Sequence, residues 1–273
     1  MDMNFLTPSQ MVTACVNSGK KKANLPPIKA FILAIMAGAW ISLAGAAATT
    51  AVSLFPYNSL VRLVTGLIFP FGLAMVIVLG SELVTGNCIM AAAFLEKEIS
   101  LKKLLKSWGI VYMGNWVGAS LCAFGGAFFG QLKINGGLLA NDAIKLAAAK
   151  CSLPFFDALV MGIFCNVLVV AGVLMALAAT DIGGKIIAAF VPVAIFVICG
   201  FEHAVANMYY IEAGLFARMN PLFSGLEVIG TADALTWGSF LFKNLLPVTI
   251  GNLIGGVLMV TAFWYCHREK PKP

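Results

Sequence analysis

Long apolar segments alternate with short polar connections along the whole chain. Six of these segments have the ~20 residues that a helix needs to cross a bilayer, and two of the six, the second and the fifth, run beyond that length and are interrupted by glycine and proline. The pattern predicts an all-α membrane protein with six transmembrane helices, of which the second and fifth are broken. The six segments lie near residues 28–51, 61–95, 105–130, 155–178, 184–211 and 240–265.

Composition supports a membrane protein with a single domain. Of the 273 residues, 60% are apolar and 11% are charged, and that charged fraction is about half of what a soluble domain carries. We therefore treat residues 1–273 as one transmembrane domain. The chain has two histidines and no CxxC pair among its seven cysteines, so we expect no metal and no cofactor. The net charge of +6 is dispersed in short connections, which argues against a nucleic-acid partner.

The basic residues are distributed unevenly between the two sides of the predicted membrane domain. An even number of spans puts both termini on one side, and twelve of the 18 lysines and arginines fall on that side. By the positive-inside rule, both termini should be cytoplasmic in a multi-pass protein of the inner (plasma) membrane. The twelve are Lys20, Lys21, Lys22, Lys29, Lys97, Lys102, Lys103, Lys106, Lys185, Arg268, Lys270 and Lys272.

The N-terminal segment and the two longest connections lie outside the six predicted spans. The first 27 residues are polar and contain no signal-peptide core before the first span. The two longest connections on the far side, roughly 131–154 and 212–239, mix Gly, polar and apolar residues. We expect any short helices there to lie on the surface.

Two halves of the chain share motifs in the same order. GSELVTGN at 80–87 is followed 120 residues later by GFEHAVAN at 200–207, and a Gly-Asn pair at 114–115 recurs at 251–252, an offset of 137. Lys22 and Lys150 are related by an offset of 128. These matches predict two three-span repeats, about 22–130 and 150–265. An odd number of spans in each repeat means that the second copy is inverted, so the two breaks should meet near the midplane of the membrane.

Several polar residues lie beside the breaks, where an ionisable group costs at least ~2.5 kcal/mol and is by default functional. His203 has no counterpart in the first repeat, which has Leu83 there, so His203 is the best candidate to face a permeating species. The remaining residues are better interpreted as structural support that satisfies backbone groups freed by the interruptions. They are Glu82, Glu202, Asn87, Asn207, Asn115 and Asn252.

The GFEHAVANM and GSELVTGN stretches and the paired Gly-Asn motifs resemble the formate/nitrite transporter family, from about Leu25 to Tyr265. The resemblance implies a homopentamer of aquaporin-like protomers, each with one pore for small monovalent weak-acid anions such as formate, nitrite and hydrosulfide. It implies pore or substrate-binding roles for His203, Thr85, Lys150 and Asn166, and constriction roles for Phe69, Leu73, Leu83 and Phe196. Many members have Phe where this chain has Val84, which favours a hydrosulfide- or formate-passing branch.

These residues could carry an anion across apolar necks. An anion loses hydration worth many kcal/mol in such a neck, and lysines at both mouths would concentrate anions. His203 and Thr85 would bind the ion by hydrogen bonds, or His203 would lend it a proton, since histidine titrates near neutrality. Simpler alternatives exist, because Lys150 could be an interfacial lysine and Thr85 could bond its own helix.

Other functions are compatible with parts of the pattern. A proton–anion symporter differs from a channel only in the stoichiometry of proton flux. A neutral small-solute channel of aquaporin type would predict NPA motifs, which the sequence lacks. A membrane-embedded enzyme is disfavoured, because there is no HExxH or GxSxG motif.

Overall fold

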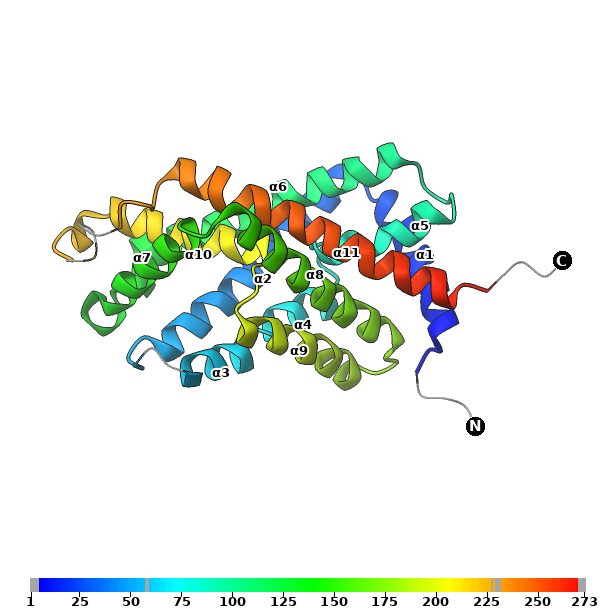
Figure 1. Ribbon diagram of the computed structural model, residues 1–273, viewed down its shortest axis with the longest axis horizontal. Helices are drawn as coiled ribbons and strands as arrows, with labels where there is room; N and C mark the ends of the chain where they lie inside the picture. The colour runs from blue at the N-terminus through cyan, green and yellow to red at the C-terminus, as the bar shows by residue number, and fades with distance from the viewer. Residues whose placement is uncertain (1–4, 57–58, 227, 229–231, 270–273) are drawn as a thin grey trace.

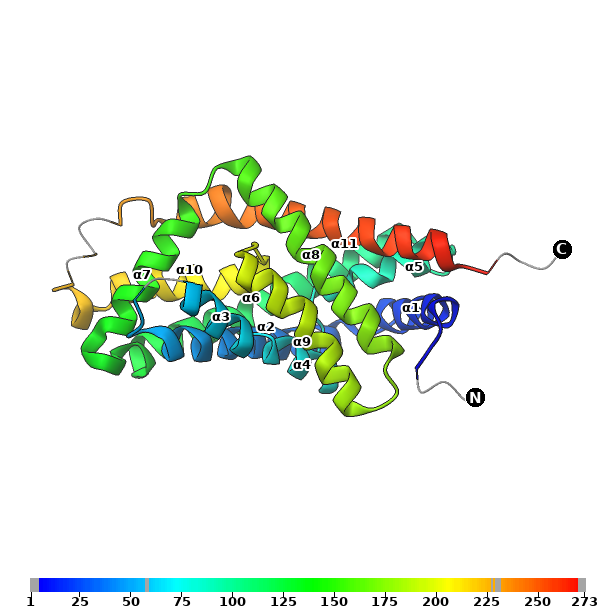
Figure 2. The same cartoon turned by 60° about the horizontal axis from the view of Figure 1, so that its bottom comes forward.

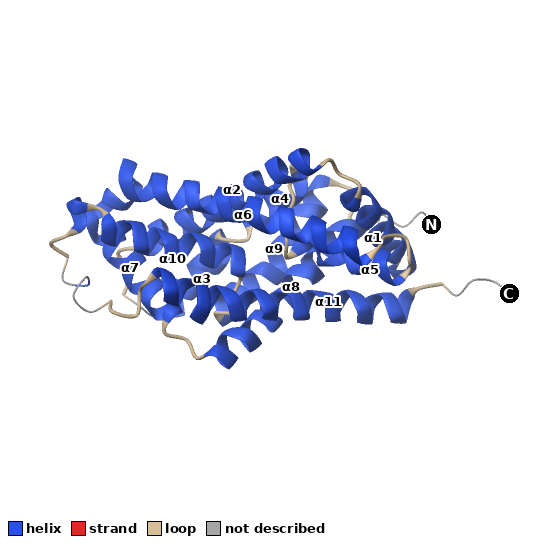
Figure 3. Cartoon of the chain, turned by 90° about the horizontal axis from the view of Figure 1, so that it is seen from above, coloured by secondary structure: helices blue, strands red, loops and turns tan. Residues whose placement is uncertain are grey.

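A computed structural model describes residues 5–56, 59–226, 228 and 232–269 and shows a helical molecule elongated along one axis (Figures 1 and 3). Both ends of the chain lie at the same end of this axis (Figures 1 and 2), where Ser9 Oγ donates a hydrogen bond to Glu269 Oε1 at 3.1 Å. The termini therefore share one side, as the even number of spans predicts. Lys270 and Lys272 lie outside the described residues.

The first half contains two continuous long helices and one broken one. Residues 79–85, between α4 and a 3-10 turn at Gly86–Ile89, are not helical, and the chain enters them through Gly80 in the left-handed region (φ +67°). The prediction of an interrupted second span is confirmed. The helices are α2 (Pro27–Val52), α3 (Ser59–Ile68), α4 (Phe71–Val78), α5 (Met90–Leu95) and α6 (Leu101–Phe129).

The second half repeats this arrangement. Gly200, with φ +75°, ends α9, and the chain is extended until α10 starts at Ala204 near the middle of the molecule (Figure 1). α10 then continues to Met219, eight residues beyond the predicted end of the fifth span. The helices are α8 (Phe155–Ala178), α9 (Ile182–Cys199), α10 (Ala204–Met219) and α11 (Leu246–His267), which follows a π-helical turn at Ser239–Leu245.

The number of apolar helical stretches agrees with a six-span protein. Within the described ranges, five stretches are long and apolar enough to cross a membrane, and a sixth is obtained if Leu101–Phe129 and the following Gln131–Cys151 are taken as one bent span. The five are Pro27–Val52, Ser59–Val78, Phe155–Ala178, Ile182–Cys199 and Ser239–His267.

Glycines let the long helices approach closely, and they do so at matching places in each half. A Cβ atom on Gly118 of α6 would lie 2.1 Å from the carbonyl oxygen of Ile35 in α2. A Cβ atom on Gly255 of α11 would lie 2.2 Å from the carbonyl oxygen of Ile163 in α8. Only a residue without a side chain fits such contacts, so the α2–α6 and α8–α11 pairs form two equivalent rigid frames.

The polar N-terminal segment contains a helix that the apolar pattern does not predict, α1 (Pro8–Ala23). Its start is stabilised by a capping box, in which the Thr7 side chain accepts from the Gln10 backbone and the Gln10 side chain accepts from the Thr7 backbone. Val12, Cys15 and Gly19 form its buried face. Helices of this length are marginal alone, so packing against the membrane domain stabilises α1.

The expectation of surface helices in the 131–154 connection is wrong for α7 (Leu138–Cys151). Leu139, Ile144 and Ala147 are fully buried, and a Cβ atom on Gly214 of α10 would lie 2.4 Å from Ala147 Cβ. The segment carries enough apolar residues on one face to pack as part of the core, and α7 lies against α10 on the side opposite the termini (Figure 1).

Candidate functional site

Asn115 of α6 closes the backbone of the first break. Its Oδ1 accepts from the Val84 N–H at 2.9 Å, and its Nδ2 donates to the carbonyl oxygens of Ala34 and Glu82, both at 2.8 Å. Asn115 is fully buried, so these three bonds satisfy groups that no water reaches.

Asn252 of α11 closes the second break in the same manner. Its Oδ1 accepts from the Ala204 N–H at 2.8 Å, and its Nδ2 donates to the carbonyl oxygens of Gly162 at 2.8 Å and Glu202 at 2.9 Å. Every partner is the repeat counterpart of a partner of Asn115, at the offsets of 120, 128 and 137 residues that the motifs display. The internal repeat is therefore present in the hydrogen bonds as well as in the sequence.

Each buried glutamate beside a break forms an ion pair with a lysine and accepts a hydrogen bond from an asparagine. In the first half, Lys22 Nζ lies 2.8 Å from Glu82 Oε1, and Asn87 Nδ2 donates to Glu82 Oε2 at 2.7 Å. Only 7% of the Glu82 side chain is exposed, and a carboxylate so buried needs such partners. Lys22 comes from the last turn of α1, so this ion pair also fastens α1 to the first break.

The second half repeats the ion pair and adds one residue. Lys150 Nζ lies 2.8 Å from Glu202 Oε1, and Asn207 Nδ2 donates to Glu202 Oε2 at 2.5 Å. Asn244, in the π-helical turn, accepts from Asn207 Nδ2 at 2.8 Å and donates to the carbonyl oxygen of Lys150 at 3.0 Å. Lys150 is therefore a partner of a buried carboxylate and not an unpaired interfacial lysine.

His203 and Thr85 meet across the repeat boundary. Thr85 Oγ1 lies 2.8 Å from His203 Nε2, and both residues are buried. His203 is the N-cap of α10, where its Nδ1 accepts from the Ala206 N–H at 3.2 Å. Because Nδ1 accepts, the neutral ring carries its proton on Nε2 and donates to Thr85 Oγ1. The Thr85 hydroxyl hydrogen is then available to a third group.

A row of aromatic rings leads away from His203. The ring centroids of His203 and Phe196 are 6.0 Å apart, those of Phe196 and Phe69 are also 6.0 Å apart, and Phe69 stacks on Tyr210 at 6.3 Å. Lys150 Nζ lies 5.9 Å from the centroid of the Tyr210 ring. A chain of contacts thus leads from His203 through Phe196, Phe69 and Tyr210 to Lys150.

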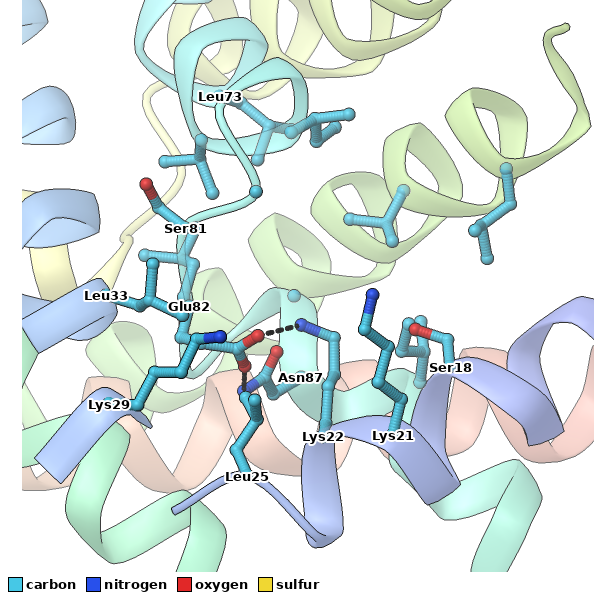
Figure 4. A pocket seen from close by; sticks show the side chains of 18 residues that line it. Ser18, Lys21, Lys22, Leu25, Lys29, Leu33, Leu73, Ser81, Glu82 and Asn87 are labelled. Carbon is cyan, nitrogen blue, oxygen red and sulfur yellow. Dashed lines mark hydrogen bonds and ion pairs between the residues drawn. The ribbon is translucent and has the colours of Figure 1, made fainter. Parts of the chain in front are cut away.

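On the side of the termini, a cavity of about 410 Å³ ends at Leu73 and Leu83. We call it the lysine vestibule, because Lys21, Lys22 and Lys29 line its mouth around Glu82 (Figure 4). Lys22 is paired with Glu82, whereas the ammonium groups of Lys21 and Lys29 have no ion pair or hydrogen bond with any described residue. The vestibule therefore carries surplus positive charge above an apolar floor.

Asn166 is fully enclosed between the two halves. Its Nδ2 donates to the carbonyl oxygen of Asn252 at 2.6 Å and lies 3.3 Å from the carbonyl oxygen of Thr85, while its Oδ1 has no partner in the part of the chain that the structure describes. The amide thus ties the first break to the second repeat. An unpartnered buried acceptor is uncommon, and it offers one hydrogen-bond site close to Thr85.

Two features of this region were missed at the level of sequence. Tyr210 has no motif of its own, and its position is occupied by Met90 in the first repeat. Glu212 is buried and accepts from Trp116 Nε1 at 2.5 Å; it comes directly after the predicted fifth span, and only the extension of α10 to Met219 places it inside a helix. Among the described residues, no group of three His, Cys, Asp or Glu side chains could hold a metal ion.

Comparison with known proteins places this geometry in a family. The family model described as "Formate/nitrite transporter" matches residues 9–266. The chain is 35% identical to the formate channel FocA of Haemophilus influenzae over 266 residues, which cover 94% of this chain and 93% of that protein. It is 34% identical to a probable formate transporter of Methanothermobacter thermautotrophicus, covering 99% of this chain and all of that protein.

A solved structure has the same fold. The pentameric formate channel with formate bound superposes with a TM-score of 0.78 at 31% identity, covering 88% of this chain and 96% of that chain. The protein is thus a multi-pass membrane protein from a group of transporters and not of enzymes. With nearly the whole length matched, the chain belongs to the formate/nitrite transporter family.

Proposed function

We propose that this protein forms a pore for small monovalent anions of weak acids, namely formate, nitrite and hydrosulfide. The observation that carries the proposal is the Thr85–His203 pair, which lies between two sets of apolar side chains. From the side of the termini, the route passes the lysine vestibule, Leu73 and Leu83, the Thr85–His203 pair, and then Phe196 and Phe69.

The positive charge at the two mouths of the proposed pore is smaller than two unpaired lysines would give. Lys22 and Lys150 are each paired with a buried glutamate, so they contribute less net charge than the sequence alone suggests. Attraction of anions into the lysine vestibule comes chiefly from Lys21 and Lys29, which have no described partner. A positive mouth with apolar walls concentrates anions locally.

The dry segment offers hydrogen bonds to the ion. The Thr85 hydroxyl, oriented by His203 Nε2, donates to an anion between the two constrictions. A second proton on His203 requires its Nδ1 to release the Ala206 N–H. Loan of a proton to the anion therefore involves a movement of the ring, whereas hydrogen bonding does not.

Flux of formate, nitrite and hydrosulfide into liposomes across a pH series tests this function. His203→Asn should retain a good N-cap for α10 but lose the contact with Thr85, so flux should fall at least tenfold while the protein still assembles. His267→Ala, in the exposed end of α11, is the matched control and should transport normally. Unchanged flux and unchanged pH dependence in His203→Asn would refute the role of His203.

The same liposomes separate a channel from a symporter. A channel for the bare anion carries electric current, whereas stoichiometric proton–anion symport moves formate without net current and alkalinises the side it leaves. Passage of glycerol or another neutral solute at comparable rates would instead support the aquaporin-type alternative.

We further propose that five copies assemble, as in the related pentameric formate channel, with both termini in the cytoplasm. The exposed apolar residues on α3, α6 and α9, among them Leu67, Leu121 and Ile195, would face lipid or neighbouring copies. Mass determination of the detergent-solubilised protein tests the stoichiometry, and any value other than five protomers contradicts it.

A further inference from the structure

The two repeats differ at Tyr210, the last aromatic ring in the row that starts at His203. Met90, in the first repeat, is fully buried, and its Sδ accepts from Ser107 Oγ at 3.6 Å. Its counterpart 120 residues later is Tyr210, which is only partly buried. A polar hydroxyl thus replaces a thioether at the corresponding place, and the internal symmetry of the fold does not require it.

The Tyr210 ring is held firmly in place. It stacks on Phe69, and its Cε1 and Cζ atoms come within 3.2 Å of the position that a Cβ atom on Gly45 would take. Gly45 of α2 therefore leaves the space that the ring fills. The hydroxyl has no hydrogen-bond partner among the described residues and is not one of the fully enclosed unpartnered atoms. Because Tyr210 is only partly buried, its hydroxyl is available to a group from outside the chain.

Lys150 places a cation over the Tyr210 ring. The ammonium group lies 5.9 Å from the ring centroid, and one of its three N–H groups is directed to Glu202. An anion that approaches Phe69 and Phe196 from this side meets the ammonium group and the phenol together. A phenol keeps its proton at neutral pH and donates a strong hydrogen bond to an anion.

We propose that the Tyr210 hydroxyl is a further specificity-determining group, which donates a hydrogen bond to one oxygen of a two-oxygen anion at the outer side of the Phe69–Phe196 constriction. The inference rests on the proposed function. Formate and nitrite have a second oxygen for Tyr210 when the first faces Lys150. Hydrosulfide has one acceptor atom, and sulfur accepts hydrogen bonds weakly. Tyr210 should therefore favour oxyanions over hydrosulfide.

Tyr210→Phe tests the hydroxyl alone, because the ring and its packing on Gly45 and Phe69 remain. Formate and hydrosulfide fluxes would be measured in liposomes that contain equal amounts of assembled protein. We expect formate flux to fall about tenfold, the effect of one hydrogen bond to a charged group, and hydrosulfide flux to change less than twofold. Tyr209→Phe is the matched control, because Tyr209 is the adjacent tyrosine and is buried. Its ratio of formate flux to hydrosulfide flux should equal that of the wild-type protein.

Three results would overturn the inference: an unchanged formate-to-hydrosulfide ratio in Tyr210→Phe, an equal loss of both fluxes, or the same change in ratio in Tyr209→Phe. Each leaves the proposed function standing if the wild-type protein transports either anion. If the wild-type protein transports neither, the proposed function itself fails, so the two failures are distinguishable.

Discussion

Asn115 and Asn252 lie 137 positions apart in the chain, yet their side-chain amides make equivalent sets of three hydrogen bonds, two at a broken span and one to a neighbouring continuous helix. Each amide binds one N–H and one carbonyl oxygen at a break, and a second carbonyl oxygen in α2 or α8. A bilayer interior provides no water to replace these partners. The pair is therefore a structural requirement of the interruption itself.

Asn252→Leu should destabilise the protein strongly. It leaves the Ala204 N–H and the Glu202 carbonyl group at the break without their partner, at about 1–3 kcal/mol for each buried group. Asn115→Leu should cost a similar amount, because its bonds are equivalent. Thermal unfolding of the purified protein in detergent measures both, with the exposed Asn24→Ala as control. A melting temperature close to that of the control in either variant would contradict the equivalence.

Removing Lys150 should be far more costly than removing an exposed lysine. Lys150→Met leaves Glu202 buried and unpaired, a loss of roughly 3–5 kcal/mol, and Lys22→Met should do the same to Glu82. Lys20 forms an ion pair with Glu98 at the same 2.8 Å distance, but with both side chains more than 40% exposed. Lys20→Met should therefore change the free energy of unfolding by less than about 1 kcal/mol.

The double variant Lys150→Met with Glu202→Gln provides a second readout. It removes both charges at once, so most of the stability lost in Lys150→Met should return. If the double variant is as unstable as the single one, an unpaired carboxylate is not the cause of the loss.

Gly118→Ala should prevent α2 and α6 from packing. The added Cβ atom would lie 2.1 Å from a backbone oxygen of α2, which cannot rotate away as a side chain can. Gly109 lies on the same helix with nothing within 4 Å of its Cβ position, and Gly109→Ala should be neutral or stabilising by up to about 1 kcal/mol. The yield of monodisperse protein after size-exclusion chromatography distinguishes the two; similar yields would show that the frames are less rigid than the distances indicate.

Thr85→Val keeps the shape of the side chain and removes the hydroxyl that bonds His203. We expect formate flux to drop by about 10- to 100-fold, since a hydrogen bond to a charged ion contributes ~1.5–3 kcal/mol. Thr65→Val is the control, because the Thr65 hydroxyl bonds only carbonyl oxygens of its own helix, Val61 at 2.8 Å and Arg62 at 3.0 Å. Flux of Thr85→Val equal to that of Thr65→Val would exclude the hydroxyl from ion binding.

Cysteine labelling tests the orientation of the termini. Cys266, in the last turn of α11, is exposed and should react with a membrane-impermeant maleimide only from the cytoplasmic side, in a variant that carries Cys199→Ser. Cys15 in α1 should stay unlabelled from either side at pH 8, because burial raises the pKa of its thiol to about 12 and the thiolate is the reactive form. Labelling of Cys266 from the outside would place the termini in the opposite compartment.

Much of the fold is predictable from local pattern, because bilayer thickness sets the length of the apolar runs and the repeated motifs indicate where the chain breaks. α1 escapes prediction because only one side of this short helix is apolar and its stability depends on Glu82, 60 residues away from Lys22. α7 is mistaken for a surface segment because its partner, Gly214 of α10, is distant in sequence.

The candidate site is predictable in its residues but less so in its contacts. The motif offsets pair Lys22 with Lys150 and Glu82 with Glu202, but they cannot indicate that each lysine binds the glutamate of its own half. The rise in offset from 120 to 137 indicates extra residues in the second half. The contact of Asn244, in the π-helical turn, with Asn207 and Glu202 is seen only in the three-dimensional structure.

The hydrogen bonds that the two halves share do not involve the side chains of His203 in the second half and Leu83 in the first. The asparagine, glutamate and lysine side chains already stabilise both broken spans. The second repeat can therefore have an imidazole and the first an aliphatic group at this position while the fold stays the same. The two repeats can therefore differ in chemistry at this one position although the rest of the scaffold is duplicated. Substitutions at Leu83 and His203 should change which solutes pass, while the protomer keeps its fold.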